Sequence, residues 1–436
     1  MFLDPGLGKT SITLAWILRL KEANPKEKIL VIAPIRVCHS VWPNEIAKWD
    51  EFKHLKCSIV HGTPAKRLKA LQADADIYLV NPEGVPWLTE LVGKRELPWS
   101  TLVIDESSKF KNWGSKRVKA LKPLLQRFKR RLILTGTPSP RHLEDLFSQM
   151  FVVDLGNSLG DSIMRFRTKY FYQGGYEGRE WLPTVSTERE IVDRIAPACM
   201  RLSAKDYLEL PAINTNDVWV DLPPDAKEVY KSMEEDMFLE LEGTAEVTAF
   251  SSGSKYLSCR QIANGGIYSD GRVRNDIHDA KIDAILDIVD ELQGKPVLVA
   301  FPFRQDVERL AQKIKHLKVI DGRTTPQAGT RLISAWNQGE IEALAVQPMA
   351  LSHGVNMQAG PGRDIIWLGL TDDLENYIQL NARIYRQGVT GQVRVHHILA
   401  KGTVDVAMLR RLRKKDGSQM SVLESIKQYR GMQHVR

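Results

Sequence analysis

Short apolar runs alternate with longer stretches of mixed polarity along the first third of the chain. The runs cover residues 28–34, 57–60, 77–80, 101–106 and 131–138. A continuous apolar run bounded by turn residues is typical of a strand buried on both faces of a parallel sheet. Residues 11–20, before the first run, and stretches between the runs, such as residues 41–52, are expected to be helices. The pattern predicts a doubly wound α/β sheet, in which ligands bind at the carboxyl ends of the strands.

The same pattern returns in the last third of the chain. Strands are expected at residues 296–301, 318–322, 343–346, 364–368 and 393–398, and helices at 306–315, 329–337 and 374–385. Between the repeats the pattern loosens from 152 to 211, and residues 223–257 form an acidic, helical stretch. We therefore predict an α/β protein with two tandem parallel-sheet lobes, residues 1–150 and 223–436. Residues 151–222 are expected to form a helical insertion and the connection between the lobes.

The composition narrows the class of protein. With 43% apolar and 26% charged residues, the chain can bury a sizeable core, and its net charge of +8 favours a polyanionic partner. Four scattered cysteines without a Cys-x-x-Cys pattern argue against a zinc site or a disulfide framework. No apolar run approaches the ~20 residues of a membrane helix, and the first residues lack the plan of a signal peptide. A soluble cytoplasmic protein without a membrane partner is expected, in a bacterial or phage-infected cell.

The first turn of the chain, residues 3–10, has the pattern of a phosphate-binding loop. Gly6 and Gly8 allow a tight turn whose N–H groups can point at an anion, and a helix is expected to start there. Lys9 can reach the β- and γ-phosphates of a nucleotide, and the Thr10 hydroxyl can bind Mg²⁺. Leu3 stands where the strict pattern has another glycine, so an ordinary turn followed by a lysine is the competing interpretation.

Two further groups suit the same chemistry. Asp105 and Glu106 end a predicted strand, where one carboxylate can hold Mg²⁺ and the next can act as general base for an attacking water. Arg383 and Arg386 are three residues apart and lie on one face of a predicted helix. Their guanidinium groups could stabilise charge on a γ-phosphate. The second lobe has no phosphate loop of its own, so one nucleotide site built from two lobes is predicted.

Residues 107–143 contain eleven Lys or Arg and no Asp or Glu. A solvated helix face usually mixes both signs of charge, so this stretch is predicted to track nucleic-acid phosphates. Its candidates for that role include Lys109, Lys111, Lys116 and Arg117. The aromatic residues among them are expected in the core, and the basic tail at 410–415 is expected to be a solvated helix rather than a phosphate contact.

The order of these pieces resembles the superfamily 2 helicases, and specifically the Swi/Snf-type DNA translocases. The resemblance covers nearly the whole chain, through motifs at residues 4–10, 33–34, 105–108, 134–138, 260–264, 321–324, 352–357 and 379–388. It implies two RecA-like lobes, ATP and Mg²⁺ as cofactors, and a monomer that moves along or remodels duplex DNA by hydrolysing ATP in the cleft between the lobes.

The resemblance also implies roles for individual residues. Nucleotide would be bound by Gly6, Gly8, Lys9, Thr10, Gly354, Asn356 and Gln379, and Mg²⁺ by Thr10 and Asp105. Catalysis would fall to Glu106, with Arg386 and Arg383 as arginine fingers. Thr135 and Thr137 would couple nucleotide state to nucleic acid, and Arg323 and Arg331 would add to the DNA contacts.

Two other functions compete with a DNA motor. The chain could be a helicase-like nucleic-acid-binding protein with weak ATPase activity, or an RNA helicase of the same superfamily. The family's upstream segment with an adenine-reading glutamine does not precede Leu3. We therefore expect a partner chain or an upstream segment to complete the first strand and the adenine pocket.

Overall fold

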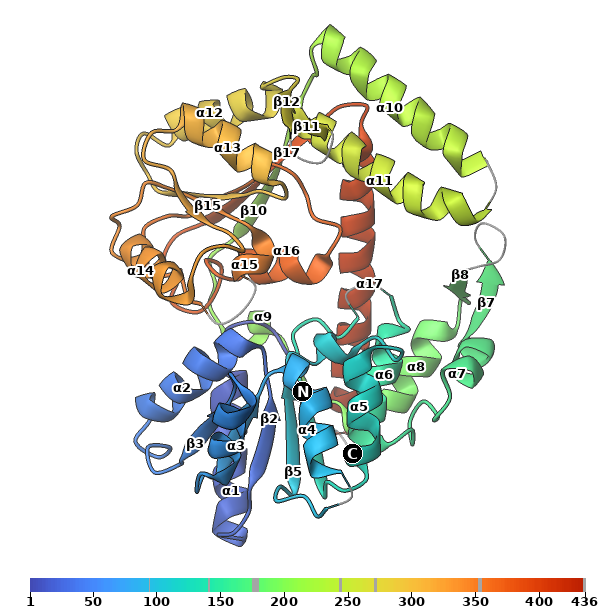
Figure 1. Cartoon of the computed structure of the whole chain (residues 1–436), viewed down its shortest axis with the longest axis vertical. Coiled ribbons are helices and arrows are strands. Elements are labelled where there is room, and N and C mark those ends of the chain that lie inside the picture. Colours follow the sequence, from blue (N-terminus) through green and yellow to red (C-terminus); the bar gives the residue numbers. More distant parts are fainter. Residues whose placement is uncertain are drawn as a thin grey trace. The chain divides into compact units, whose positions relative to one another are not determined.

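The computed structural model describes the chain except residues 94, 140–141, 175–179, 243–244, 270–272, 352–354 and 434–436. The chain forms two compact units, one of residues 1–208 with 415–436 and one of residues 209–414 (Figure 1). Each unit is built on a parallel sheet, so the predicted α/β class with two parallel-sheet lobes is confirmed. No helix in the described ranges is long and apolar enough to cross a lipid bilayer.

The sheet of the first unit has the strand order β3-β4-β2-β5-β6. Its strands are β2 (Ile29–Ile32), β3 (Cys57–Val60), β4 (Ile77–Val80), β5 (Thr101–Asp105) and β6 (Arg130–Leu134). Its helices include α1 (Lys9–Ala23), α2 (Trp42–Lys48), α3 (Pro64–Gln72), α4 (Val85–Val92), α5 (Lys116–Leu125) and α6 (Asp145–Asp154). The strands were predictable because both faces are covered: Ile29 and Val31 pack with α1 and α2, whereas Leu30 and Ile32 pack with α4, α5 and α6.

The start of the chain extends this sheet beyond β6. Strand β1 (Phe2–Leu3) pairs in parallel with β9 (Arg201–Leu202), and Phe2 also bridges to Thr135 just after β6. The Met1 ammonium donates a hydrogen bond to the Ile133 carbonyl at 2.6 Å. The phosphate loop therefore leaves from a short strand that is paired on both sides.

The division between the units differs from the predicted boundaries at 150 and 222. Residues after 151 form α7 (Ile163–Tyr170), β7 (Phe171–Gly174), β8 (Glu180–Pro183), α8 (Thr187–Ile195) and α9 (Ala204–Tyr207). Phe166 and Ile191 belong to the same core as the strand residues of β5, so this stretch is part of the first unit rather than a separate insertion. Val422 and Leu423, near the end of the chain, belong to that core as well.

The sheet of the second unit has the order β10-β17-β16-β13-β15-β14. Its strands are β10 (Ile213–Val220), β13 (Val297–Ala300), β14 (Lys318–Ile320), β15 (Ala343–Val346), β16 (Asp364–Trp367) and β17 (Val393–Ala400). Its helices are α10 (Pro224–Glu242), α11 (Ala245–Asn264), α12 (Ala280–Glu291), α13 (Arg304–Lys313), α14 (Pro326–Asn337), α15 (Pro348–Leu351) and α16 (Leu374–Asn381), and α17 (Val404–Gln433) starts there. The predicted strands and helices of this lobe are confirmed within a few residues. However, α16 ends at Asn381, so Arg383 and Arg386 lie in the turn after it and not on one face of a helix as predicted. Strand β10 was missed because it lies at the sheet edge and most of its residues are exposed or half-buried.

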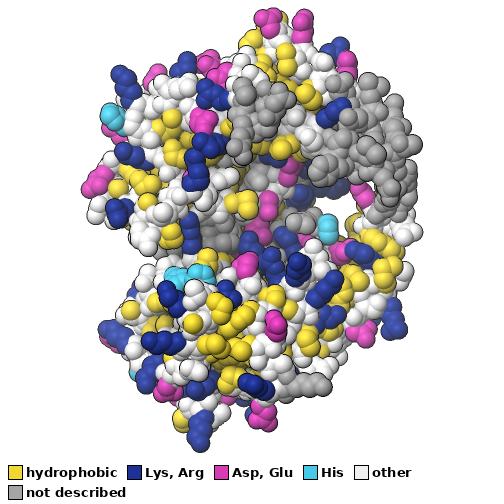
Figure 2. All heavy atoms as spheres, viewed as in Figure 1, with side chains coloured by type: hydrophobic (Ala, Val, Ile, Leu, Met, Phe, Trp, Pro, Cys, Tyr) yellow, Lys and Arg dark blue, Asp and Glu magenta, His cyan; other side chains and the backbone are white. Residues whose placement is uncertain are grey.

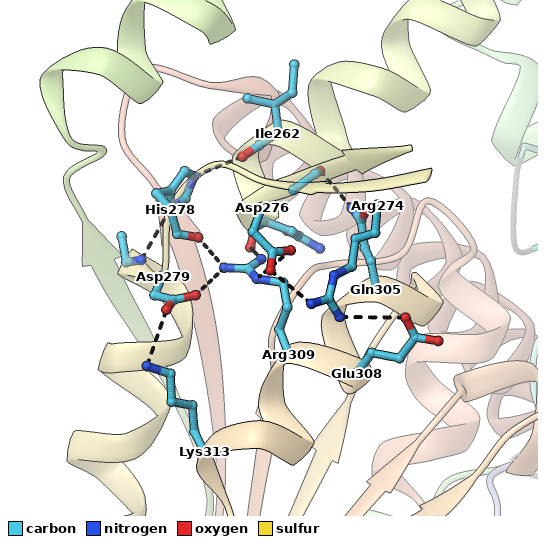
Figure 3. A network of polar contacts seen from close by, with 12 residues as sticks. Ile262, Arg274, Asp276, His278, Asp279, Gln305, Glu308, Arg309 and Lys313 are labelled. Atoms are coloured by element: carbon cyan, nitrogen blue, oxygen red, sulfur yellow. Dashed lines mark hydrogen bonds and ion pairs between the residues drawn. The ribbon is translucent and has the colours of Figure 1, made fainter. Parts of the chain in front are cut away.

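A buried arginine fastens the end of α11 to α13 (Figure 3). Arg309 on α13 donates hydrogen bonds to the Asn264 carbonyl at 2.9 Å and to Asp279 at 2.6 Å, and it also contacts the His278 carbonyl. Gly265 has a φ of 110°, and a Cβ there would collide with Arg309 and with His278. Burial lowers the pKa of His278 to about 4, so its imidazole is neutral at pH 7. The hairpin of β11 (Gly266–Ser269) and β12 (Val273–Asp276) begins at this anchor.

Candidate nucleotide and nucleic-acid sites

The phosphate loop folds as the sequence predicts. It runs from β1 to α1, with Gly6 at φ 90° and Gly8 at φ 69°, a backbone region that favours glycine. Gly8 is the residue before the first turn of α1, and no acidic residue lies in that turn to compete with a bound anion. The Lys9 ammonium donates a hydrogen bond to the Leu3 carbonyl at 3.0 Å, which folds the side chain back over the loop. An ordinary turn would need neither two glycines with positive φ, nor a helix that starts directly after them, nor a lysine folded over the loop.

An ion pair that sequence reasoning missed holds the loop in place. Arg201 on β9 is almost fully buried and contacts Asp4 of the loop at 2.6 Å. The other Asp4 oxygen accepts a hydrogen bond from the Ala204 amide at 2.9 Å. On the opposite side, a Cβ at Gly136 would lie 3.1 Å from the Leu3 carbonyl, so glycine lets the loop pass close to the chain after β6. No local pattern links residues about two hundred positions apart.

Asp105 ends β5 in a buried position suited to a metal ligand. Burial raises the pKa of its carboxyl group, and the Trp42 indole, which donates to Asp105 at 3.1 Å, and the charge of Lys9 oppose that rise. The charge of Lys9 therefore acts on the Asp105 carboxyl group at the end of β5. Carboxylate and hydroxyl oxygens are the ligands that Mg²⁺ prefers, so Asp105 and Thr10, which is also buried, fit that ion.

Glu106 stands in an unusual backbone conformation. Its φ of 58° and ψ of 60° lie in the left-handed region, which costs about 1–2 kcal/mol for a residue with a side chain. Such strain is concentrated at functional positions, where the surrounding structure enforces it. The conformation turns the chain sharply from β5 into the helical turn at Ser107–Phe110.

A buried glutamine joins Ser107, which follows the acidic pair, to the segment after β6. Gln149 on α6 accepts a hydrogen bond from the Ser107 hydroxyl at 2.7 Å and donates one to the Pro138 carbonyl at 2.6 Å. In the same segment, the Thr135 hydroxyl accepts from the Thr137 amide at 3.0 Å. Among the described residues the Thr137 hydroxyl has no hydrogen-bond partner, although it is buried. Gln149 was missed because it lies on a helix with no motif of its own.

In the second unit, the two predicted arginines contact the segment at Val355–Met357. Arg383 donates to the Val355 carbonyl at 3.1 Å, and its own carbonyl accepts from the Met357 amide at 3.0 Å. Arg386 donates to the side-chain oxygen of Asn356. Gln379 is buried on α16 and donates to Glu375 at 3.3 Å. Arg383, Arg386 and Asn356 therefore form one cluster, whereas Gln379 contacts a residue of its own helix and Gly354 lies outside the described residues.

The predicted nucleic-acid residues differ in their surroundings. Lys116 is exposed at the start of α5, Arg117 lies 3.8 Å from Glu83, and Lys109 and Lys111 are half-buried. Figure 2 shows Lys and Arg side chains near α5 and α6 of the first unit. A cavity of about 410 Å³ lies beside this basic stretch, lined in part by Lys111, Trp113, His142 and Arg167.

The remaining predictions for this surface concern the second unit and the aromatic residues. Arg323 is held by Asp321 at 2.6 Å, and Arg331 is exposed on α14. Phe110 and Phe128 are buried, as expected, and Trp113 packs against the same core.

Comparisons with known proteins agree with this arrangement. The model of the SNF2-related domain matches residues 1–264, and that of the helicase conserved C-terminal domain matches residues 280–388. The chain is 34% identical to the putative protein p41 of Acyrthosiphon pisum secondary endosymbiont phage 1, over 97% of this chain and 93% of that protein. It is 24% identical to an uncharacterized ATP-dependent helicase of Mycoplasma genitalium, over 99% of this chain but only 41% of that protein.

Among solved structures, the Sulfolobus solfataricus SWI2/SNF2 ATPase core in complex with dsDNA is similar at 23% identity, with a TM-score of 0.43. That match covers 98% of this chain and 91% of the solved one, and the assignment does not depend on it. The SNF2-related model covers more than half of the chain, and the phage protein is related over nearly its full length. The chain therefore belongs to the SNF2-related family and carries a helicase C-terminal domain.

Proposed function

We propose that the chain is an ATP-driven motor that moves along or remodels duplex DNA. The observation that carries this proposal is the arrangement at the end of β5, where buried Asp105 interacts with Lys9 and is followed by strained Glu106. A binding protein without turnover would have no need for a general base held at a cost in backbone energy. The relative from Mycoplasma genitalium is named an ATP-dependent helicase, which supports the same activity here.

Each residue of the site has a chemical role in this proposal. The backbone N–H groups of residues 6–10 and the Lys9 ammonium bind the β- and γ-phosphates, while Thr10 and Asp105 hold Mg²⁺. When bound, Mg²⁺ neutralises charge on the phosphates. Glu106 orients a water and accepts its proton as the water attacks the γ-phosphate. Arg386, with Arg383, stabilises the charge that develops on the transferred group.

The basic stretch at residues 107–143 supports nucleic acid as the polymer on which the motor acts. Contacts to phosphates do not distinguish one base sequence from another, so the affinity for DNA should not depend on the sequence. Because such contacts are electrostatic, the affinity should also fall steeply as the salt concentration rises. Thr135 and Thr137 lie within this stretch. Gln149 links Pro138, next to Thr137, to Ser107, next to the acidic pair, which supports a route from nucleotide to nucleic acid.

The first prediction tests the function of the intact chain. Steady-state ATP hydrolysis should be slow alone and should rise at least about tenfold with duplex DNA, and less with single-stranded RNA. An ATPase assay with each polymer at matched nucleotide concentration measures this. Stronger stimulation by RNA would identify an RNA helicase, and DNA binding without hydrolysis would identify a helicase-like binding protein.

The second prediction concerns the basic surface. In the double variant Lys116→Glu, Arg117→Glu, DNA binding and DNA-stimulated ATPase should fall while basal ATPase stays within about twofold of wild type. Losing two phosphate contacts should reduce the slope of log K against log salt by about 2. Fluorescence anisotropy at several salt concentrations measures both quantities.

The matched control is Lys26→Glu with Arg95→Glu. These exposed residues precede β2 and β5, at the amino ends of the strands and therefore at the opposite edge of the sheet. The control changes the net charge equally but should leave the salt slope unchanged. Equal losses in both double variants would show that net charge, not this surface, governs binding.

A further inference from the structure

A chain of hydrogen-bonded side chains crosses the second unit from α16 to α17. The Tyr377 hydroxyl on α16 lies 2.9 Å from Nε2 of His397 on β17. Nδ1 of His397 lies 3.0 Å from Asp217 on β10, and the other Asp217 oxygen accepts from Arg413 on α17 at 2.7 Å. We call Tyr377, His397, Asp217 and Arg413 the relay. It joins two helices through two neighbouring strands that pair in register, Asp217 opposite His397.

The relay has a defined direction of donors. His397 is almost fully buried, and burial lowers its pKa, so the imidazole is neutral at pH 7. With the carboxylate of Asp217 at Nδ1, the proton sits on that nitrogen and Nε2 accepts from the Tyr377 hydroxyl. The hydrogen bonds therefore run from the Tyr377 hydroxyl through His397 to the Asp217 carboxylate, which also accepts from Arg413.

At its first end the relay contacts α16, the helix that precedes Arg383 and Arg386. Tyr377 and Asn381 are one turn apart on α16, so they lie on the same face of the helix. The Asn381 side chain accepts a hydrogen bond from the Trp367 indole at 3.1 Å, and the Tyr377 ring packs on that indole with centroids 5.1 Å apart. Arg383 lies two residues after the end of this helix, so its position depends on how α16 packs.

At its other end the relay reaches the basic tail that was expected to be a solvated helix. Arg413 contacts Asp217, and Arg411 lies 3.6 Å from Asp372, which directly precedes the N-terminal cap of α16. The same helix α17 continues to Val422, Leu423 and Ile426, which are buried in the core of the first unit. The two arginines therefore connect α16 to a helix whose last turns belong to the other unit.

We propose that Tyr377 and His397 are positioning residues for ATP hydrolysis. Through Asp217 and Arg413 they couple the position of α16 to α17. The position of α16 in turn sets the positions of Arg383 and Arg386. The inference rests on the proposed function for its effect on catalysis. A change of nucleotide state felt by the arginines is passed to α17, and a shift of α17 is passed back. Neither residue touches the reacting atoms.

The test uses the full chain with saturating duplex DNA and compares two ends of the relay that share no partner. Tyr377→Phe keeps the ring on Trp367 and removes only the hydroxyl, so it should lower kcat on the order of 5- to 50-fold with KM for ATP within about twofold. Arg413→Met breaks an exposed ion pair and should lower kcat by about 2- to 5-fold. If the relay acts as one unit, the double variant should be no slower than Tyr377→Phe alone.

Two matched controls separate coupling from local damage. His396→Asn removes the neighbouring histidine of β17, which points to the other face of the sheet and contacts Asp364 at 2.9 Å. Arg410→Met removes an exposed arginine of α17 outside the relay. Both should leave kcat within about twofold of wild type. Effects of the two relay variants that multiply, or a control as slow as Tyr377→Phe, would overturn the proposal.

Amide hydrogen exchange gives a readout that needs no catalysis. Arg413→Met should speed exchange in residues 374–381 of α16, whereas Arg410→Met should not. If the wild type hydrolyses no ATP, the proposed function fails while the exchange result still decides on the relay. Unchanged exchange in α16 would overturn the relay even in an active motor.

Discussion

Replacing Glu106 with glutamine should preserve ATP binding and lower ATP hydrolysis on the order of 10²–10⁴-fold. A carboxamide has nearly the same shape as the carboxylate and can hold the attacking water, but it cannot accept the proton. The substitution leaves the backbone strain at φ 58° as it is, so the fold should be unaffected. Single-turnover hydrolysis and equilibrium binding of a fluorescent ATP analogue measure the two effects separately.

Two other variants serve as comparisons for Glu106→Gln. Lys9→Ala should lose nucleotide binding itself, because the ammonium contributes to the grip on the phosphates. Glu83→Gln changes an exposed glutamate that follows β4 at the same edge of the sheet, and it should hydrolyse ATP normally. Wild-type turnover in Glu106→Gln would remove this residue as general base and with it the main support for a motor.

The strands could be predicted where burial on both faces left a continuous apolar run. Residues 77–80 and 343–346 are such runs, and each became a strand with every residue buried. Strand β10 could not be predicted in the same way, because an edge strand packs on fewer neighbours and keeps polar residues such as Asn214 and Asn216. The return of Val422 to the first unit was also hidden, since only the folded chain brings it to that core.

The residues of the candidate site also differ in whether the sequence alone could suggest them. Residues within a short motif, such as Lys9 and Asp105, could be proposed from the sequence because the motif itself implies their geometry. Arg201, Gln149 and Trp42 could not, because each reaches the motifs from an element far away in sequence. A single chain carries no signal for such pairs, and only the packing of the sheet and its helices reveals them.

Replacing Arg386 with alanine should lower the DNA-stimulated rate of ATP hydrolysis by about 10³–10⁵-fold, the range seen for arginine fingers in phosphoryl transfer. The guanidinium stabilises charge that develops only in the transition state, so kcat should fall while DNA affinity stays at the wild-type level. Arg386→Lys should recover little of the rate, because a point charge lacks the planar fork that matches phosphate oxygens. Steady-state ATPase kinetics with anisotropy-based DNA binding test both variants.

The contact between Arg386 and Asn356 sharpens this prediction. The side chain of Asn356 holds the guanidinium in place, so Asn356→Ala should lower kcat less than Arg386→Ala, and the double variant should be no slower than Arg386→Ala. Arg304→Ala is the matched control, since that exposed arginine of α13 contacts Glu308 on its own helix. This substitution should leave kcat at the wild-type level. Wild-type turnover in Arg386→Ala would mean that the arginine completing the site is another residue, with Arg383 the first to test. Loss of DNA binding in parallel with kcat would instead assign Arg386 to the polymer rather than to the nucleotide.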